Sequence, residues 1–249
     1  MDFIADLHTH TLVSNHAYNT VTEMVTQAKK LGLYAMAVTD HGVAMPDAPH
    51  LWYFYNIHSL PDIVDGVWLL KGTEANVMDV DGTLDFSDDL LKRFDLDWII
   101  VSIHSDTLAP KLDFDSATKL WLNVAENPYV DMIGHSESRF HEYDYDAVTK
   151  VFAQNNKVVE MNGNSANCRP GNEDNMRRLA LACKKNGTKI AVNSDAHSIY
   201  SLADVDTVTP MLKEIKFPRE LIVNATKENL IAELKLHGKK IAAKMEEQL

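Results

Sequence analysis

The sequence has few cysteines and no long apolar run. Only two cysteines, Cys168 and Cys183, occur in 249 residues, so a disulfide framework is excluded and reduced thiols are expected. No apolar stretch approaches the ~18 residues of a membrane span. The N-terminus also lacks the basic start and apolar core of a signal peptide. We therefore expect a cytoplasmic protein with no membrane segment.

Positive charge is also scarce. Lysine and arginine number 24 against 36 aspartates and glutamates, which gives a formal net charge of −12. Nucleic acids are bound largely through phosphate contacts from basic side chains, so DNA and RNA are unfavourable partners for this chain. A metal centre could still attract a small anion into an acidic protein.

Short apolar runs alternate with amphipathic stretches along the chain, and no linker or low-complexity segment divides it. This alternation is typical of parallel strands joined by helices, and we expect a single α/β domain over residues 1–249. Strands are predicted over residues 3–8, 34–41, 67–74, 98–104, 131–135, 157–162 and 189–195, with a shorter eighth over 221–224.

Helix boundaries are marked by capping residues and glycines. An Asp-Gly turn predicts a small hairpin within residues 79–86, after the third strand. Three helices are predicted from their caps, between Thr20 and Gly32, between Asn172 and Gly187, and between Thr226 and Gly238.

Side chains of the types that can bind metals recur where the predicted strands end. In a closed parallel barrel these ends meet at one face, whereas an open sheet would spread them along a line. The pattern therefore predicts a barrel with one central site. The residues at these ends are His8, His10, Asp40, His41, Glu74, His104, His135, Glu160, Asn162, Asp195 and His197.

The histidines among them form a metal-site pattern. His8 and His10 alternate along a strand, so both imidazoles share one face. Burying this many polar groups together costs several kcal/mol unless metal ions compensate them. We therefore predict that the set binds metal ions. Of the other histidines, His50 is predicted to line the pocket, and surface positions are predicted for His58, His141 and His237.

The ordered motifs resemble one protein family. DLHTH, SNHAY with His16, TDHG, GTEAN, SIHS, MIGH and NSDAH resemble the PHP (polymerase and histidinol phosphatase) family, and DAPHLWYF, VVEMN and GNEDN are similar to its YcdX-like phosphatases. The resemblance implies a distorted (β/α)7 TIM-like barrel that holds three divalent metal ions, most often zinc. A ligand set of nitrogen and oxygen also suits manganese or iron.

The resemblance further implies a role for each ligand. Glu74 would bridge two ions, and open coordination positions would admit water and substrate. The first ion would be bound by His8, His10, Glu74 and Asp195, the second by Glu74, His104 and His135, and the third by His16, His41 and His197.

The implied function is a metal-dependent phosphatase that hydrolyses a small phosphomonoester with a metal-bound hydroxide. Arg169 follows the sixth strand, and its guanidinium could bind the phosphate. Asp6 and Asp40 could orient imidazoles from behind. The acid that protonates the leaving group stays open between a metal-bound water, His197 and Asp106. The partner is thus a small phosphorylated metabolite, and a homo-oligomer is compatible with the sequence.

Three segments depart from the family pattern, and three other functions stay open. His104 is followed by Ser-Asp rather than Glu-Pro, His135 by Ser-Glu-Ser rather than Pro-Gly, and the loop NGNSANCR is one residue short. All three departures spare the predicted ligands and alter the surrounding pocket.

Three alternative functions stay open: phosphodiester or exonuclease hydrolysis, amidohydrolase-type C–N hydrolysis, and metal storage or regulation without catalysis. An amidohydrolase-type site usually has a lysine that bridges its metal ions, and no lysine ends a predicted strand here.

Overall fold

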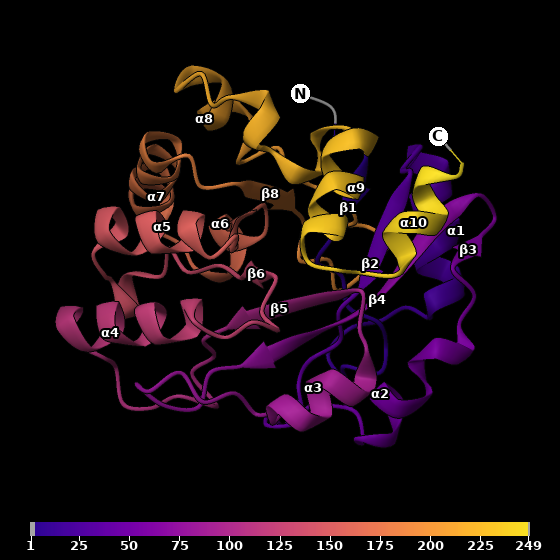
Figure 1. The fold of residues 1–249 in the computed structure, drawn as a ribbon, viewed down its shortest axis with the longest axis horizontal. Coiled ribbons are helices and arrows are strands. Elements are labelled where there is room, and N and C mark those ends of the chain that lie inside the picture. The colour runs from indigo at the N-terminus through magenta and orange to yellow at the C-terminus, as the bar shows by residue number, and fades with distance from the viewer. Residues whose placement is uncertain (1–2, 249) are drawn as a thin grey trace.

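A nearly closed parallel sheet forms the centre of the molecule (Figure 1). The computed structural model describes residues 3–248. Within them the parallel strands are β1 (Ala5–Asp6), β2 (Ala35–Val38), β4 (Val67–Asn76), β5 (Trp98–Ser102), β6 (Met132–Ile133), β7 (Val158–Asn162) and β8 (Ile190–Asn193), paired in that order. Each matches one predicted strand, which confirms the (β/α)7 TIM-like barrel. A short β3 (Ile63–Val64), which was not predicted, pairs antiparallel with β4.

Helices cover the outside of this sheet (Figure 1). The longer ones are α1 (Val21–Leu31), α3 (Asp88–Phe94), α4 (Phe114–Ala125), α5 (Tyr145–Gln154), α7 (Glu173–Asn186) and α9 (Lys227–Leu236). Shorter ones are α2 (Trp52–Asn56), α6 (Ser165–Cys168), α8 (Thr209–Glu214) and α10 (Ile241–Glu246). No helix in the described range is long and apolar enough to cross a bilayer.

The predicted helix boundaries are confirmed. Thr20 and Glu23 form a capping box at the start of α1, which ends at the left-handed Gly32. Helices α7 and α9 lie within the limits set by their caps. The predicted hairpin is also present, as an antiparallel bridge between Val77 and Leu84.

The predicted eighth strand is reduced to one parallel bridge between Ile222 and Ile190 of β8, because two 3-10 turns, η3 (Arg219–Leu221) and η4 (Val223–Ala225), flank Ile222. Beside this bridge, the side chain of Asn224 bonds to the backbone of β1 and of β8. Its Nδ2 donates to the carbonyl oxygens of Ala5 at 2.8 Å and of Val192 at 2.6 Å, and its Oδ1 accepts from the Val192 amide at 3.1 Å. This side chain therefore links the facing edges of β1 and β8, which also meet through a parallel bridge between Thr9 and Ala196.

The two ends of the barrel interior differ in polarity. Glu74, Ile100, Met132 and Val158 are neighbours in the strand register, so they share the inner face. Ile100 and Met132 pack with buried side chains of α9 and α10 in one apolar cluster. Helices α9 and α10 therefore close the apolar end, and the polar site lies at the opposite end.

His237 lies at the apolar end, and the prediction that it is a surface residue is wrong. Its side chain is 7% exposed, with Nδ1 3.0 Å from Asp131 Oδ1 and Nε2 3.2 Å from Glu233 Oε1. The end of α9 places the ring over the start of β6, where Asp131 is itself buried. His58 is exposed and His141 is half-buried.

Candidate metal centre

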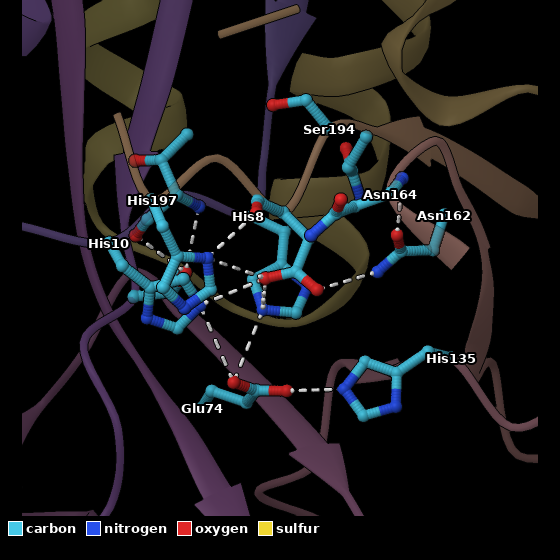
Figure 2. A network of polar contacts seen from close by, with 12 residues as sticks. His8, His10, Glu74, His135, Asn162, Asn164, Ser194 and His197 are labelled. Atoms are coloured by element: carbon cyan, nitrogen blue, oxygen red, sulfur yellow. Dashed lines mark hydrogen bonds and ion pairs between the residues drawn. The ribbon is translucent and has the colours of Figure 1, made fainter. Parts of the chain in front are cut away.

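The predicted ligands converge at the carboxyl ends of the strands (Figure 2). Because parallel strands bring these ends to one face of a barrel, residues far apart in the sequence become neighbours. His8 and His10 follow β1, His41 follows β2, Glu74 lies in β4, His104 follows β5, His135 follows β6, and Asp195 and His197 follow β8. His16 lies in the loop before α1.

Glu74 occupies the middle of this cluster and is 1% exposed. Its two carboxylate oxygens face two separate groups of imidazoles, as Figure 2 shows for His8 and His135. Oε2 lies 3.3 Å from Nε2 of His8, 3.5 Å from that of His10 and 3.2 Å from that of His41. Oε1 lies 2.9 Å from Nε2 of His135 and 3.5 Å from that of His104. This is the arrangement that a carboxylate bridging two cations requires.

Asp195 approaches the first group from β8. Its Oδ1 lies 3.5 Å from His8 Nε2 and 3.2 Å from His10 Nε2. Asp195 has a φ of 52° and His135 a φ of 27°, conformations that cost a residue other than glycine about 1–3 kcal/mol. Hydrogen bonds from Asn162 Nδ2 to Asp195 Oδ2, and from the His135 amide to Glu160, hold both residues in place. Two members of the cluster are thus held in a left-handed backbone conformation by their neighbours.

His16, His41 and His197 form a third group beside the first. The ring centroids lie 4.4 Å apart between His16 and His197 and 5.2 Å apart between His16 and His41. Asp47 lies behind this group, with Oδ2 2.8 Å from His16 Nδ1 and 3.0 Å from His41 Nδ1. His10 stacks on His197 with centroids 4.3 Å apart and joins this group to the Glu74 cluster.

Most imidazoles of the cluster are fixed through Nδ1. His8 Nδ1 lies 2.8 Å from Glu160 Oε1, and His104 Nδ1 lies 2.7 Å from Asn76 Oδ1. His197 Nδ1 lies 3.0 Å from the carbonyl oxygen of Asp195. A proton on Nδ1 leaves the lone pair on Nε2, which is the tautomer that a metal ligand needs.

These partners were not assigned by sequence reasoning. Glu160 and Asn76 lie at strand ends, so a signal was present, whereas Asp47 lies in a loop and gave none. The structure does not place Asp6 or Asp40 against an imidazole ring. Asp6 accepts hydrogen bonds from Ser194 and from the Ala203 amide. Asp40 accepts hydrogen bonds from the Thr11 amide and from the hydroxyl groups of Thr11 and Tyr53. Both therefore fix the loops that carry ligands.

The electrostatics of the cluster are those of buried carboxylates held charged by imidazoles. Burial acts to raise the pKa of Glu74, but His8 and His104 hold that pKa well below its ordinary value. The pKa of Asp195 is likewise lowered, because His8 and His10 outweigh the effect of burial.

Several nitrogen atoms at the centre lack hydrogen-bond partners. Nε2 of His8, His10 and His197 is buried and lacks a well-aligned hydrogen bond within the described chain, and the Nε2 atoms of His8 and His10 lie 3.3 Å from Glu74 Oε2 and 3.2 Å from Asp195 Oδ1, respectively. Unpaired buried polar atoms cost about 1–3 kcal/mol each, so a native structure retains them only with a compensating ligand. Imidazole nitrogens and carboxylate oxygens converging without a lysine or arginine between them fit a divalent cation.

Arg169 borders the cluster and lines a cavity of about 400 Å³. Its Nη2 lies 3.6 Å from Asp195 Oδ2, and its Nε lies 3.7 Å from Oε1 of the buried Glu137. Glu137 was not singled out from the sequence. His50 is exposed, accepts a bond from the Trp52 amide at 3.2 Å and is not among the residues that line this cavity. Asp106 is also exposed and outside the lining, whereas His197 lines it.

Comparison with known proteins identifies relatives along nearly the whole chain. A probable phosphatase of Acetivibrio thermocellus is 38% identical over 98% of this chain and 100% of its own length. A probable phosphatase of Caldicellulosiruptor saccharolyticus is 39% identical over 95% of this chain and 98% of its own.

Solved structures share the fold. The histidinol phosphate phosphatase of Lactococcus lactis, in complex with zinc, L-histidinol and phosphate, superposes with a TM-score of 0.64 and 18% identity, over 86% of this chain and 94% of that one. A probable 2-pyrone-4,6-dicarboxylic acid hydrolase of Acinetobacter baumannii gives a TM-score of 0.57 and 14% identity, over 94% and 100%. The model of the PHP domain matches residues 6–166, which hold His8 to His135 of the cluster. The chain therefore belongs to the PHP domain family.

Proposed function

We propose that the protein is a metal-dependent phosphatase that hydrolyses a small phosphomonoester at a centre of three divalent ions. The observation that carries this proposal is that the two carboxylate oxygens of Glu74 face the Nε2 atoms of two separate groups of histidines. A carboxylate bridging two ions suits a reaction in which both an attacking and a leaving oxygen must be stabilised. The names of the relatives, probable phosphatases, agree with this reaction class.

The ligand assignment follows from the groups described above. The unpaired Nε2 atoms and the Nδ1 contacts support it, because each ring would present its free lone pair to an ion. We assign His8, His10, Glu74 and Asp195 to the first ion, Glu74, His104 and His135 to the second, and His16, His41 and His197 to the third. Zinc suits this set of donors, and manganese or iron would also be accepted.

When bound, the ions would lower the pKa of a coordinated water and neutralise the charge of the phosphoryl group. The residues of the chain supply the remaining functions. Arg169 can donate two parallel hydrogen bonds to phosphate oxygens, and Asp195 and Glu137 hold its guanidinium toward the cavity. Glu160 and Asp47 hold His8, His16 and His41 in fixed orientations.

The cavity also bears on the substrate and on the alternative reactions. A volume of about 400 Å³ is suited to a small molecule rather than a polymer. The Lactococcus lactis neighbour was crystallised with zinc and phosphate, which agrees with a small phosphorylated substrate. No lysine lines this cavity in the described structure, so the bridging lysine expected of an amidohydrolase-type site has no counterpart here.

The test combines metal analysis with a choice of two substrates. Protein purified without added metal is analysed for its elements and assayed with p-nitrophenyl phosphate and bis-p-nitrophenyl phosphate. We expect about three ions per chain and preferential monoester turnover. Glu74→Ala should lose both, whereas Glu214→Ala, which changes an exposed glutamate paired with Arg177, should lose neither. Preference for the diester would replace the proposed reaction with phosphodiester hydrolysis. Absence of ions and of turnover after zinc or manganese is added would refute the metal-dependent function.

A further inference from the structure

A second cavity adjoins the metal centre, and we call it the side pocket. Its volume is about 510 Å³. It shares His104, His135, Cys168 and Arg169 with the wall of the cavity above the cluster, so the two cavities adjoin at these residues. A molecule whose phosphoryl group lies at the metal centre would extend past Arg169 into the side pocket.

The side pocket has positive charge and no acidic group in its lining. Lys111 and Arg169 line it, and no aspartate or glutamate does, although the whole chain has a net charge of −12. Arg169 is paired with Asp195 and Glu137, so the uncompensated charge is that of Lys111. Lys111 is exposed and lies with Nζ 5.7 Å from the centroid of Phe140. It has no ion-pair partner among residues 3–248. A free ammonium at the rim of a cavity without carboxylates attracts an anion.

The rest of the lining is apolar or donates hydrogen bonds. Ile103, Leu108 and Phe140 form an apolar strip, and Phe140 is 54% exposed. His141 Nδ1 accepts a bond from the Leu112 amide at 3.3 Å, which places its proton on Nε2 and leaves that atom as a donor. The wall therefore combines a surface for hydrocarbon with donors suited to an anion.

Each of the three segments that depart from the family pattern contributes a residue to the lining of the side pocket. Ser105 follows His104, Ser138 belongs to the segment after His135, and Cys168 belongs to the short loop before Arg169; all three line the pocket. The departures therefore gather at one place and leave the predicted ligands unchanged.

We propose that the side pocket binds the leaving group of the substrate, and that this leaving group carries a second anion, a carboxylate or a phosphate, next to Lys111. A short apolar spacer, in contact with Ile103, Leu108 and Phe140, would separate this anion from the phosphoryl group that is cleaved. The inference rests on the proposed function for the position of the cleaved phosphate. It adds the chemical class of substrate, a phosphomonoester with an anionic tail.

The test measures binding separately from hydrolysis. Phenylphosphonate, 4-carboxyphenylphosphonate and 1,4-phenylenebisphosphonate are titrated into the zinc-loaded protein by calorimetry, since phosphonates are not hydrolysed. We expect the two compounds with a second anion to bind about fivefold more tightly than phenylphosphonate, the gain of one partly exposed ion pair. After the twofold statistical advantage of the symmetric bisphosphonate is divided out, the compound that binds more tightly identifies the tail as carboxylate or phosphate.

Variants assign the preference to one side chain. Lys111→Met should remove the preference for the anionic compounds, and Lys111→Glu should reverse it. Lys119→Met is the matched control, because Lys119 is an exposed lysine paired with Asp81 outside the side pocket, and it should keep the preference. Since Lys111 is exposed, neither of its substitutions removes a buried contact.

Each outcome decides between the two proposals. Equal affinities for all three phosphonates, or a preference unchanged in Lys111→Met, would overturn the role of the side pocket. Phenyl phosphate and 4-carboxyphenyl phosphate are assayed in parallel. Hydrolysis without an anionic preference leaves the proposed function standing and rejects the side pocket. Tight, Lys111-dependent binding without hydrolysis supports the side pocket and rejects the phosphatase. If no phosphonate binds, the side pocket is rejected as well.

Discussion

Replacing Glu160 by glutamine tests whether the carboxylate behind the cluster controls metal binding. Glu160 is completely buried, with Oε1 2.8 Å from His8 Nδ1 and Oε2 accepting from the His135 amide at 3.0 Å. Burial acts to raise the pKa of Glu160, but the charge of His8 outweighs it and lowers that pKa. Glu160 is therefore a charged acceptor that keeps the proton of His8 on Nδ1.

The expected magnitude follows from this contact. Glutamine keeps the shape and one acceptor oxygen but removes the charge, so His8 would be a weaker and less constrained ligand. Loss of such an orienting partner lowers metal affinity by about 10- to 100-fold. This corresponds to about 1.4–2.7 kcal/mol of binding free energy. Glu160→Ala should have a larger effect, because it leaves two donors without any acceptor.

Competition with a fluorescent zinc chelator measures this affinity without any assay of activity. Glu233→Gln is the matched control, because Glu233 is 1% exposed and also faces an imidazole, that of His237, at the opposite end of the barrel. It should destabilise the fold and leave zinc affinity unchanged. A zinc affinity in Glu160→Gln within about twofold of the wild type would refute the orienting role.

Three further predictions concern barrel closure, pH and phosphate binding. Asn224→Ala removes three hydrogen bonds to buried backbone groups and should lower the free energy of unfolding in urea by about 3–5 kcal/mol; a loss below about 1 kcal/mol would contradict the role of Asn224 in joining β1 to β8. Burial lowers the pKa of His237, but Asp131 and Glu233 raise it from 6.5 to about 8. Because the folded pKa exceeds the unfolded one, this stabilisation of about 2 kcal/mol is complete below pH 6.5 and is lost as the pH rises through about 8. The free energy of unfolding of His237→Gln, measured in urea below pH 6.5 and above pH 8, should lack this dependence on pH. Arg169→Met should lower kcat/KM for p-nitrophenyl phosphate by about 10- to 100-fold, the loss of a charged hydrogen-bond pair, and an unchanged value would exclude phosphate binding by Arg169.

The barrel and the cluster could be predicted from the sequence because both depend on local periodicity. Each βα unit ends in a polar side chain, and the register of a parallel barrel brings such ends together whatever the details of packing. His8, His41 and Glu74 are therefore found where the pattern predicts them, although their binding of ions stays a prediction. The capped helices follow for the same reason, since Thr20 and Glu23 act within one turn.

The remaining features depend on contacts that no local pattern encodes. Asn224 links β1 and β8 only because the closed barrel brings Ala5 and Val192 to the same side chain. Asp47 reaches two imidazoles from a loop without regular structure, and His237 is buried only because Asp131 lies beneath it. The side pocket needs the spatial meeting of segments that lie far apart in the sequence.

The closure between β1 and β8 also sets an order for assembly during synthesis. Asp6 accepts from Ser194, 188 residues further along, and His8 meets Asp195 at the same seam. The N-terminal segment leaves the ribosome first, so its imidazoles stay without these partners until β8 has emerged. A chain stopped before β8 would keep several paired strands but an incomplete cluster. Because Asp195 belongs to the proposed ligands of the first ion, acquisition of that ion would report that translation has passed Asp195.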